Sequence, residues 1–271
     1  MEDFLVERNI STLLRFWRLA ARVPFALDLA APPARESPYA LTQARASAVF
    51  EILLCSGVPS QLALAYMFAL AGFTPLGTDG RLSFGYITAL LLLDATLLIA
   101  LIFWFLVRHG EHPRDVFLGR RPVGHEIRIG IPMTAVVFML AVLVLSTAQW
   151  IFPSLHNVQD NPLQHLINSP AEALVLAIVA TIGGGLREEI QRAFILHRFE
   201  QHLGGGMVGL IVYSTIFGLG HGLQGWDAVL TTAMLGLFWG YVYLTRRSII
   251  APVVSHSGFN AAEIFMFLLK K

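Results

Sequence analysis

Charged residues and cysteine are scarce in this chain. Asp, Glu, Lys and Arg make up only 14% of its 271 residues, whereas a typical soluble protein has about 25%. A single cysteine, Cys55, excludes an internal disulfide and any multi-cysteine metal site. The formal net charge of +1 argues against nucleic acid as a partner. Because 55% of the residues are hydrophobic, the shortage of charge indicates a protein that lies in a lipid bilayer.

Long apolar stretches make up most of the remaining sequence. A transmembrane helix needs about 20 mostly apolar residues, and seven stretches reach this length. The sequence therefore predicts an all-α polytopic membrane protein, a bundle of about seven (six to eight) transmembrane helices. Gly57 and Pro59 predict a kink in the first span. The predicted spans are 48–75, 84–107, 130–153, 171–190 and beyond, 206–223, 227–245 and 248–269.

The N-terminal residues have a different pattern. Apolar side chains mix with Arg8, Arg15 and Arg18 between Phe4 and Ala20. This pattern fits an amphipathic N-terminal helix on an anionic membrane surface, and it fits a soluble amphipathic lid equally well. We expect a cytoplasmic or interfacial segment over residues 1–46, followed by one transmembrane helical domain over residues 47–271.

Basic residues fall almost entirely on alternate connections between the predicted spans. Of 19 Lys and Arg residues, 16 lie in 1–46, in 108–129, in 187–198 and at Arg246–Arg247. Since cytoplasmic connections carry the excess of basic residues, the pattern predicts a cytoplasmic N-terminus. Seven spans would then place the C-terminus on the opposite side of the membrane.

Ionisable residues inside a membrane span are costly and usually functional. Two of them, Asp94 and Glu263, are expected to be local hydrogen-bonding or boundary groups. The others fall into pairs spaced by four residues, and such pairs share one face of a helix. These pairs are Glu188 with Arg192, Phe217 with His221, and His256 with Asn260, and Glu189 adjoins the first pair.

The connections place these pairs at one depth in the membrane. Glu188 and His221 are each about 16 residues from a turn at 204–205, so antiparallel helices would hold both roughly 24 Å from that turn. A second hairpin that turns at Arg246–Arg247 would place His256 roughly 14 Å deep, with Asn260 one turn further. We therefore predict a site of two carboxylates, two imidazoles and an amide. Gly183–Gly185 would allow neighbouring helices to approach closely.

This set of side chains suits peptide hydrolysis. A carboxylate and an imidazole can deprotonate a water molecule, while an amide and a second imidazole can stabilise the oxyanion that forms on a peptide carbonyl. No cofactor is then needed. The alternative is a divalent metal such as zinc, held by Glu188, His221 and His256. The sequence contains no His-Glu-x-x-His or Gly-x-Ser-x-Gly pattern, which disfavours a thermolysin-like zinc site and a serine nucleophile.

Three runs resemble the motifs of the CAAX protease and bacteriocin-processing (CPBP, or Abi) family. They are Arg-Glu-Glu-Ile-Gln-Arg at 187–192, Phe-Gly-Leu-Gly-His at 217–221 and His-Ser-Gly-Phe-Asn at 256–260. The family motifs are Glu-Glu-x-x-x-Arg, Phe-x-x-x-His and His-x-x-x-Asn. The resemblance covers about residues 170–269 and implies an intramembrane endopeptidase of the glutamate type, formerly grouped with the metalloproteases.

Carried over position by position, the resemblance implies a role for each residue of the predicted site. Glu188 would be the general base, and His221 would help to hold and activate the water. His256 and Asn260 would form the oxyanion site, and Glu189 would support the others.

One motif position departs from the family pattern. The family Arg follows the second Glu by four residues, where this chain has Ala193, and Arg192 comes one residue earlier. With this spacing Arg192 could pair with Glu188 instead of Glu189. Arg192 and Phe217 are therefore expected to be supporting residues.

The expected substrate is a peptide or membrane protein presented in the lipid bilayer of the cell (inner) membrane. Two non-catalytic alternatives remain: an immunity or scaffold protein, and a proton-coupled transporter that uses the Glu/His cluster as a relay. Transporters often show inverted repeats and paired broken helices, and neither is recognisable in this sequence.

Overall fold

The computed structural model describes residues 37–77, 80–159 and 166–270. The chain divides into two compact units, Met1–Ala40 and Leu41–Lys271, and the predicted site belongs to the second. The expected amphipathic helix Phe4–Ala20 lies outside the described residues. The predicted domain boundary between residues 46 and 47 stays a prediction.

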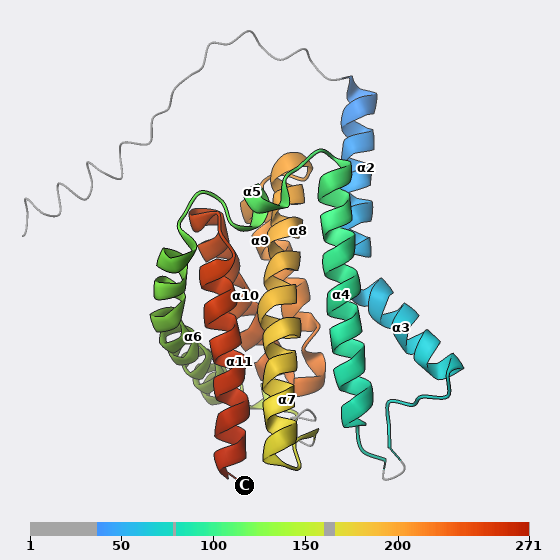
Figure 1. The fold of residues 1–271 in the computed structure, drawn as a ribbon. Helices are drawn as coiled ribbons and strands as arrows, with labels where there is room; N and C mark the ends of the chain where they lie inside the picture. Colours follow the sequence, from blue (N-terminus) through green and yellow to red (C-terminus); the bar gives the residue numbers. More distant parts are fainter. Residues whose placement is uncertain (1–36, 78–79, 160–165, 271) are drawn as a thin grey trace, which may run out of the picture. The chain divides into compact units, whose positions relative to one another are not determined.

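The regular secondary structure of the described residues is helical, apart from an isolated bridge between Leu76 and Leu82 (Figure 1). A π-helix, Thr181–Arg187, joins two of the α-helices, and short 3-10 turns lie at Pro153–Leu155 and Gly222–Gln224. The α-helices are α2 (Pro38–Leu54), α3 (Val58–Leu70), α4 (Phe84–Arg108), α5 (Pro113–Phe117), α6 (Val123–Ile151), α7 (Pro170–Ala180), α8 (Glu188–His202), α9 (Gly206–Leu219), α10 (Trp226–Arg246) and α11 (Ile250–Lys270).

Each predicted span corresponds to helical structure. Among the described residues, three helices are long and apolar enough to cross a membrane, namely α4, α6 and α10, and the bent pair of α2 and α3 would make a fourth. These helices support a membrane protein. The count of about seven spans stays a prediction, because α9 is short and the fourth predicted span consists of α7, the π-helix and α8.

The first span is broken, as Gly57 and Pro59 predict. Helices α2 and α3 meet at an angle of 42°. Gly57 precedes α3 with a φ of 86°, a left-handed conformation that glycine adopts without steric cost. Pro59 lies in the first turn of α3, where its missing N–H removes no helical hydrogen bond.

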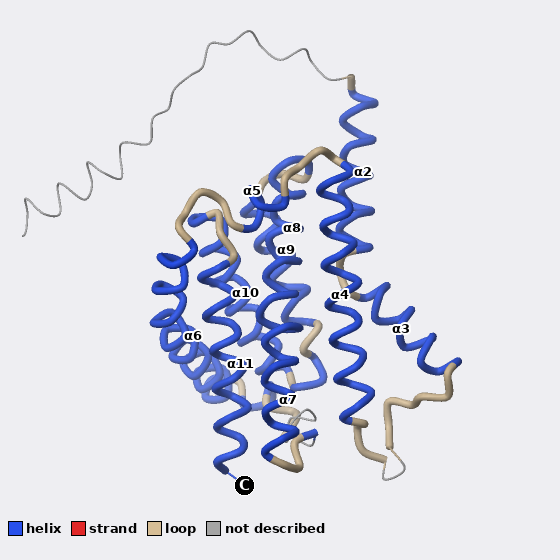
Figure 2. Tube along the Cα trace, in the orientation of Figure 1, coloured by secondary structure: helices blue, strands red, loops and turns tan. Residues whose placement is uncertain are grey.

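One continuous helical segment runs from Pro170 to His202 and includes the π-helix (Figure 2). Ser169 caps its start by accepting a hydrogen bond from the Glu172 amide. The segment ends at the turn before α9, so the predicted hairpin between the fourth and fifth spans is confirmed.

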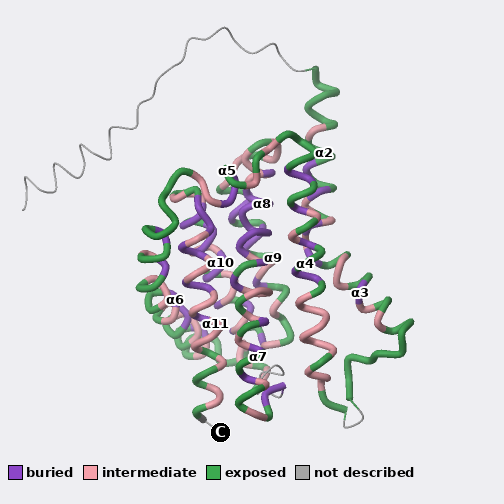
Figure 3. Tube along the Cα trace, viewed as in Figure 1, coloured by how far each residue is buried: buried purple, intermediate pink, exposed green. Residues whose placement is uncertain are grey.

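Helix α8 is the most deeply buried helix near the site. Residues 189–196 are all buried (Figure 3), and they pack against Leu98, Ile102 and Leu106 of α4 and Tyr243 of α10. Helix α11 packs against α6 and the π-helix, while α10 packs against α9 and α6. The helices that carry the predicted motifs therefore lie together around α8.

Three arginines overturn part of the charge pattern used to predict orientation. Arg187, Arg192 and Arg198 do not lie on a connection between spans; all three are buried in the π-helix and α8. Each is neutralised by a carboxylate in an ion pair, which is how a buried guanidinium is tolerated. The other basic segments keep their asymmetry, and the cytoplasmic N-terminus stays a prediction.

Candidate active site

Two adjacent carboxylates lie directly after the π-helix. Glu188 and Glu189 are the first residues of α8, and π-helical turns occur frequently at functional sites. The Glu189 side chain is 1% exposed and the Glu188 side chain 18% exposed. The two neighbours therefore differ in access: the Glu189 side chain is buried, whereas the Glu188 side chain is partly exposed.

Arg192 pairs with the inner carboxylate. Its guanidinium forms an ion pair with Glu189, so the pairing with Glu188 that the shifted spacing left open is not adopted. Because the two residues are three positions apart on α8, they share a face of the helix. The same guanidinium packs over the rings of Tyr213, Phe217 and Trp239, with centroid distances of 5.5, 4.8 and 5.6 Å, in cation–π contacts.

His256 lies between both glutamates. Its Nδ1 is 2.8 Å from Oε1 of Glu189, and its Nε2 is 3.8 Å from Oε2 of Glu188. The ring stacks on Trp239, with a centroid separation of 3.8 Å and an interplanar angle of 14°. Trp239 is itself held by a hydrogen bond of 3.0 Å from Nε1 to Oγ of Ser255. Stacking on Trp239 and the contacts of both ring nitrogens with the glutamates therefore fix the orientation of the imidazole.

Asn260 follows one turn later on α11 and contacts the start of the π-helix. Its Nδ2 donates a hydrogen bond of 3.3 Å to the carbonyl of Ala180. A Cβ at Gly184 would overlap with this amide, and a Cβ at Gly185 would overlap with Oγ of Ser257. The predicted role of the glycine run, close helix approach, is thus confirmed at these two positions.

His221 lies at the same end of the α8–α9 hairpin as Glu188. The chain turns between the two helices, Phe199 packs at Gly209, and Arg192 packs on Tyr213. Continued along both helices, this antiparallel pairing brings the start of α8 beside the end of α9. His221 is in the turn that follows Leu219.

The His221 ring is held locally. Its Nδ1 lies 2.9 Å from the carbonyl of Phe217, and its ring meets the Phe217 ring edge-on at 5.0 Å. Within the described ranges, no hydrogen bond or ion pair joins it to Glu188, Glu189 or His256. The structure thus brings two glutamates, His256 and Asn260 together and leaves His221 outside their direct contacts.

The two remaining ionisable residues of the spans behave differently from each other. Asp94 is a buried hydrogen-bonding group, as expected, and it also forms an ion pair with Arg187. Glu263 is exposed on α11 and contacts none of the site residues through a hydrogen bond or ion pair in the described part of the chain. The sequence analysis missed the partner of Asp94, although a carboxylate in mid-span calls for a cation nearby.

The structure gives no support to the alternative metal site. Among the described residues, no group of three His, Cys, Asp or Glu side chains could hold one. The alternative ligand set needs His221 beside Glu188 and His256, and the structure does not join it to them. That the protein works without a cofactor stays a prediction.

Residues 170–262 match the family model of the type II CAAX prenyl endopeptidases, Rce1-like. This segment is therefore similar to the CAAX protease family. The resemblance predicted from the three motifs is therefore confirmed for this part of the chain, which begins with α7 and ends within α11. No curated protein and no solved structure matches the chain.

The matched segment contains every residue of the predicted site, whereas helices α2 to α6 precede it. Two residues that the sequence analysis gave no role also contribute to the site geometry. Trp239 stacks on His256, and Arg187, the residue before Glu188, is anchored by its ion pair with Asp94. Both are conspicuous only after folding, because neither belongs to one of the spaced motif pairs.

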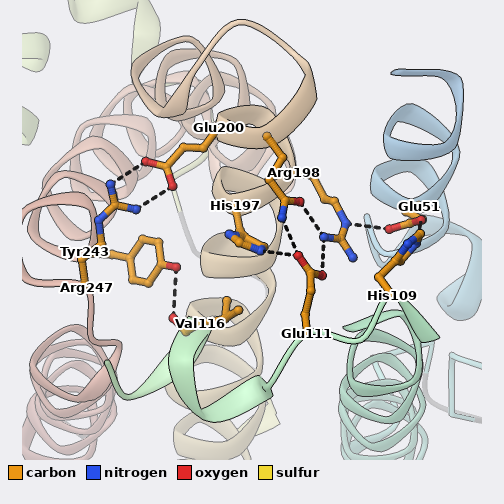
Figure 4. Close-up of polar contacts among 10 residues, drawn as sticks. Glu51, His109, Glu111, Val116, His197, Arg198, Glu200, Tyr243 and Arg247 are labelled. Atoms are coloured by element: carbon orange, nitrogen blue, oxygen red, sulfur yellow. Dashed lines mark hydrogen bonds and ion pairs between the residues drawn. The ribbon is translucent and has the colours of Figure 1, made fainter. Parts of the chain in front are cut away.

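A second polar cluster surrounds Arg198, near the opposite end of α8 (Figure 4). Arg198 donates from Nε to Glu51 at 2.6 Å and from Nη1 to Glu111 at 2.6 Å. His197 and Gln201 also contact the Glu111 carboxylate. Burial raises the pKa of Glu111, but the hydrogen bonds from Arg198, Gln201 and His197 outweigh it, so the pKa lies below its usual 4.5.

Proposed function

We propose that this protein is an intramembrane endopeptidase that hydrolyses a membrane-presented peptide or protein with water activated by Glu188. One observation carries the proposal: His256 contacts Glu189 through one ring nitrogen and approaches Glu188 through the other. This geometry separates a held carboxylate from an accessible one. The family match over residues 170–262 supports peptide-bond hydrolysis of the CAAX protease type.

Glu188 is the general base. Arg192 neutralises its neighbour Glu189, so the Glu188 carboxylate keeps its capacity to accept a proton. A water molecule beside it would lose a proton to the carboxylate as the water oxygen attacks the peptide carbonyl carbon. His221, at the same end of the hairpin, holds the water from the side of α9.

His256 and Asn260 stabilise the oxyanion. Glu189 accepts a hydrogen bond from Nδ1 of His256, and in the doubly protonated ring Nε2 also donates, toward the oxygen of the attacked carbonyl. The Asn260 amide, one turn further along α11, is the second donor. When the tetrahedral intermediate collapses, the C–N bond breaks and the leaving amine takes the proton from Glu188.

The experiment compares purified wild-type protein in lipid nanodiscs with the Glu188→Gln variant. The substrates are peptides extracted from cell membranes, and mass spectrometry identifies the cut products. Loss of the general base should lower cleavage by about 10²-fold or more. Glu263→Gln is the matched control, because it removes an exposed carboxylate from the same membrane domain.

Cleavage that persists in Glu188→Gln would refute the assignment of the base. Absence of any cleavage by the wild type, across prenylated and unprenylated peptides, would instead favour the immunity, scaffold or transporter alternatives.

A further inference from the structure

Arg187 occupies a special position beside the proposed base. It is the last residue of the π-helix and directly precedes Glu188. Its buried guanidinium donates from Nη2 to Asp94 at 2.7 Å and from Nη1 to Gln191 at 3.1 Å. Burying an ion pair carries a desolvation cost that often equals its Coulomb gain. Stability alone is therefore a weak reason for a charged pair at this place.

Asp94 is held in turn by the broken first span. It accepts hydrogen bonds from Ser60 and from Gln61, the latter at 3.3 Å, both on α3. A Cβ at Gly57 would overlap with Nη2 of Arg187. The break between α2 and α3 therefore makes room for the guanidinium and supplies two donors to its partner.

A second link joins the same break to α8. Gln191 donates from Nε2 to the carbonyl of Cys55 at 2.7 Å, and Tyr213 donates to its Oε1 at 3.2 Å. The Cys55 carbonyl lies just after the end of α2. Residues on both sides of the glutamate pair, Arg187 and Gln191, are thus fastened to the segment between α2 and α3.

We infer that Asp94 and Arg187 are positioning residues, which set the place of Glu188 and Glu189 against His256. The inference rests on the proposed function for its consequence, but its geometric content is independent of it. Helices α2 to α4, which lie outside the family match, would then help to position the residues of the active site.

A double variant separates positioning from plain stabilisation. Removing one partner of a buried ion pair leaves an uncompensated charge, whereas replacing both is often neutral for stability. We therefore combine Asp94→Asn and Arg187→Gln in one double variant. The matched control is Glu126→Gln with Arg246→Gln, which removes another ion pair with a buried carboxylate, bonded at 2.7 and 2.8 Å. That pair joins α6 to the end of α10.

The expected result is a thermal unfolding midpoint close to that of the wild type for both double variants. Cleavage should differ: kcat of the Asp94/Arg187 variant should fall about 100-fold with KM nearly unchanged, as for a displaced catalytic group. The control variant should keep the kcat of the wild type. If the Asp94/Arg187 variant kept both the unfolding midpoint and the kcat of the wild type, the inference would be overturned.

A second measurement needs no activity. In protein labelled with 15N-histidine, the imidazole signals of His256, assigned with His256→Ala, report the two glutamate contacts. They should shift in the Asp94/Arg187 variant and stay in place in the control. If the double variant does not fold, Ser60→Ala, which removes one donor to Asp94, should shift the same signals to a smaller extent.

The failures of the two proposals are distinguishable. Unshifted His256 signals overturn the positioning inference even if the wild type cleaves peptides and Glu188→Gln does not. A wild type without cleavage overturns the proposed function, while the His256 signals still decide the positioning.

Discussion

Nδ1 of His256 and Oε1 of Glu189 lie 2.8 Å apart, although 67 residues separate them in the chain. The same carboxylate forms the ion pair with Arg192 inside the protein. Glu189 therefore joins α8 to α11 and leaves Glu188 as the accessible carboxylate of the pair. This division of the two neighbours leads to the first prediction.

Glu189→Gln should destabilise the protein far more than Glu188→Gln does. Glu189→Gln leaves the guanidinium of Arg192 buried without its partner, which should cost about 3–5 kcal/mol of the free energy of unfolding. Glu188→Gln should change that free energy by less than about 1 kcal/mol and abolish cleavage. Denaturant unfolding in detergent micelles measures the free energy of unfolding of each variant. Equal destabilisation by the two variants would contradict the division.

Gly184→Ala should displace the Asn260 amide. The new Cβ would overlap with Nδ2 at the flexible end of the Asn260 side chain, which can rotate away at little cost. Stability should therefore stay nearly unchanged, while loss of one oxyanion donor should lower kcat by about 10²–10³-fold.

Gly183→Ala is the matched control for this prediction, since its added Cβ would meet only Cβ of Leu91, at 4.0 Å, among the described residues outside its own helix. Replacing a helical glycine with alanine there should raise stability by up to about 1 kcal/mol and leave kcat as it is. A similar fall in kcat for both variants would show that the π-helix, and not Asn260, is affected.

Stability should decrease in acid through Glu111. Its pKa is lowered in the folded protein from the ordinary 4.5, so the unfolded chain takes up this proton first as the pH falls. The contribution of Glu111 is complete above about pH 4.5 and is lost as the pH falls through the lowered folded pKa. Unfolding midpoints measured across this range should fall less steeply in Glu111→Gln. Parallel pH profiles for the two proteins would contradict the prediction.

Chelation should leave cleavage intact. The described residues offer no group of three metal-binding side chains. In the proposed mechanism Glu188 alone accepts the proton from water. Activity after dialysis against EDTA should equal that of the untreated protein, with no gain on adding zinc. If EDTA removed the activity and zinc restored it, the result would contradict the prediction and favour a metal-dependent enzyme.

Much of the architecture was predictable from apolar length and connection symmetry. The stretch predicted as 84–107 is α4, Phe84–Arg108, and the stretch predicted as 227–245 is α10, Trp226–Arg246. Spans are recognisable in a sequence because a bilayer demands a minimum run of apolar residues. The hairpin between α8 and α9 followed from equal distances of Glu188 and His221 to one turn.

The contacts of the site were less predictable. Arg192 could have reached either glutamate by spacing, and its choice of Glu189 depends on the rings of Tyr213, Phe217 and Trp239, which come from two other helices. The π-helix has no signal in the run Gly183–Gly185 that distinguishes it from an ordinary flexible helix. Helix α11, which is distant in the sequence, packs against it.

The sequence by itself indicated that the chain lies in a membrane, and it predicted which residues carry the chemistry and that they share a depth. These properties depend on local composition and on the fixed rise of a helix. Only the tertiary structure decided that Glu189 is held and Glu188 accessible, that Trp239 orients His256, and that Arg187 reaches Asp94. Each of these depends on the rotation of one helix against another, which side-chain packing sets and linear spacing does not.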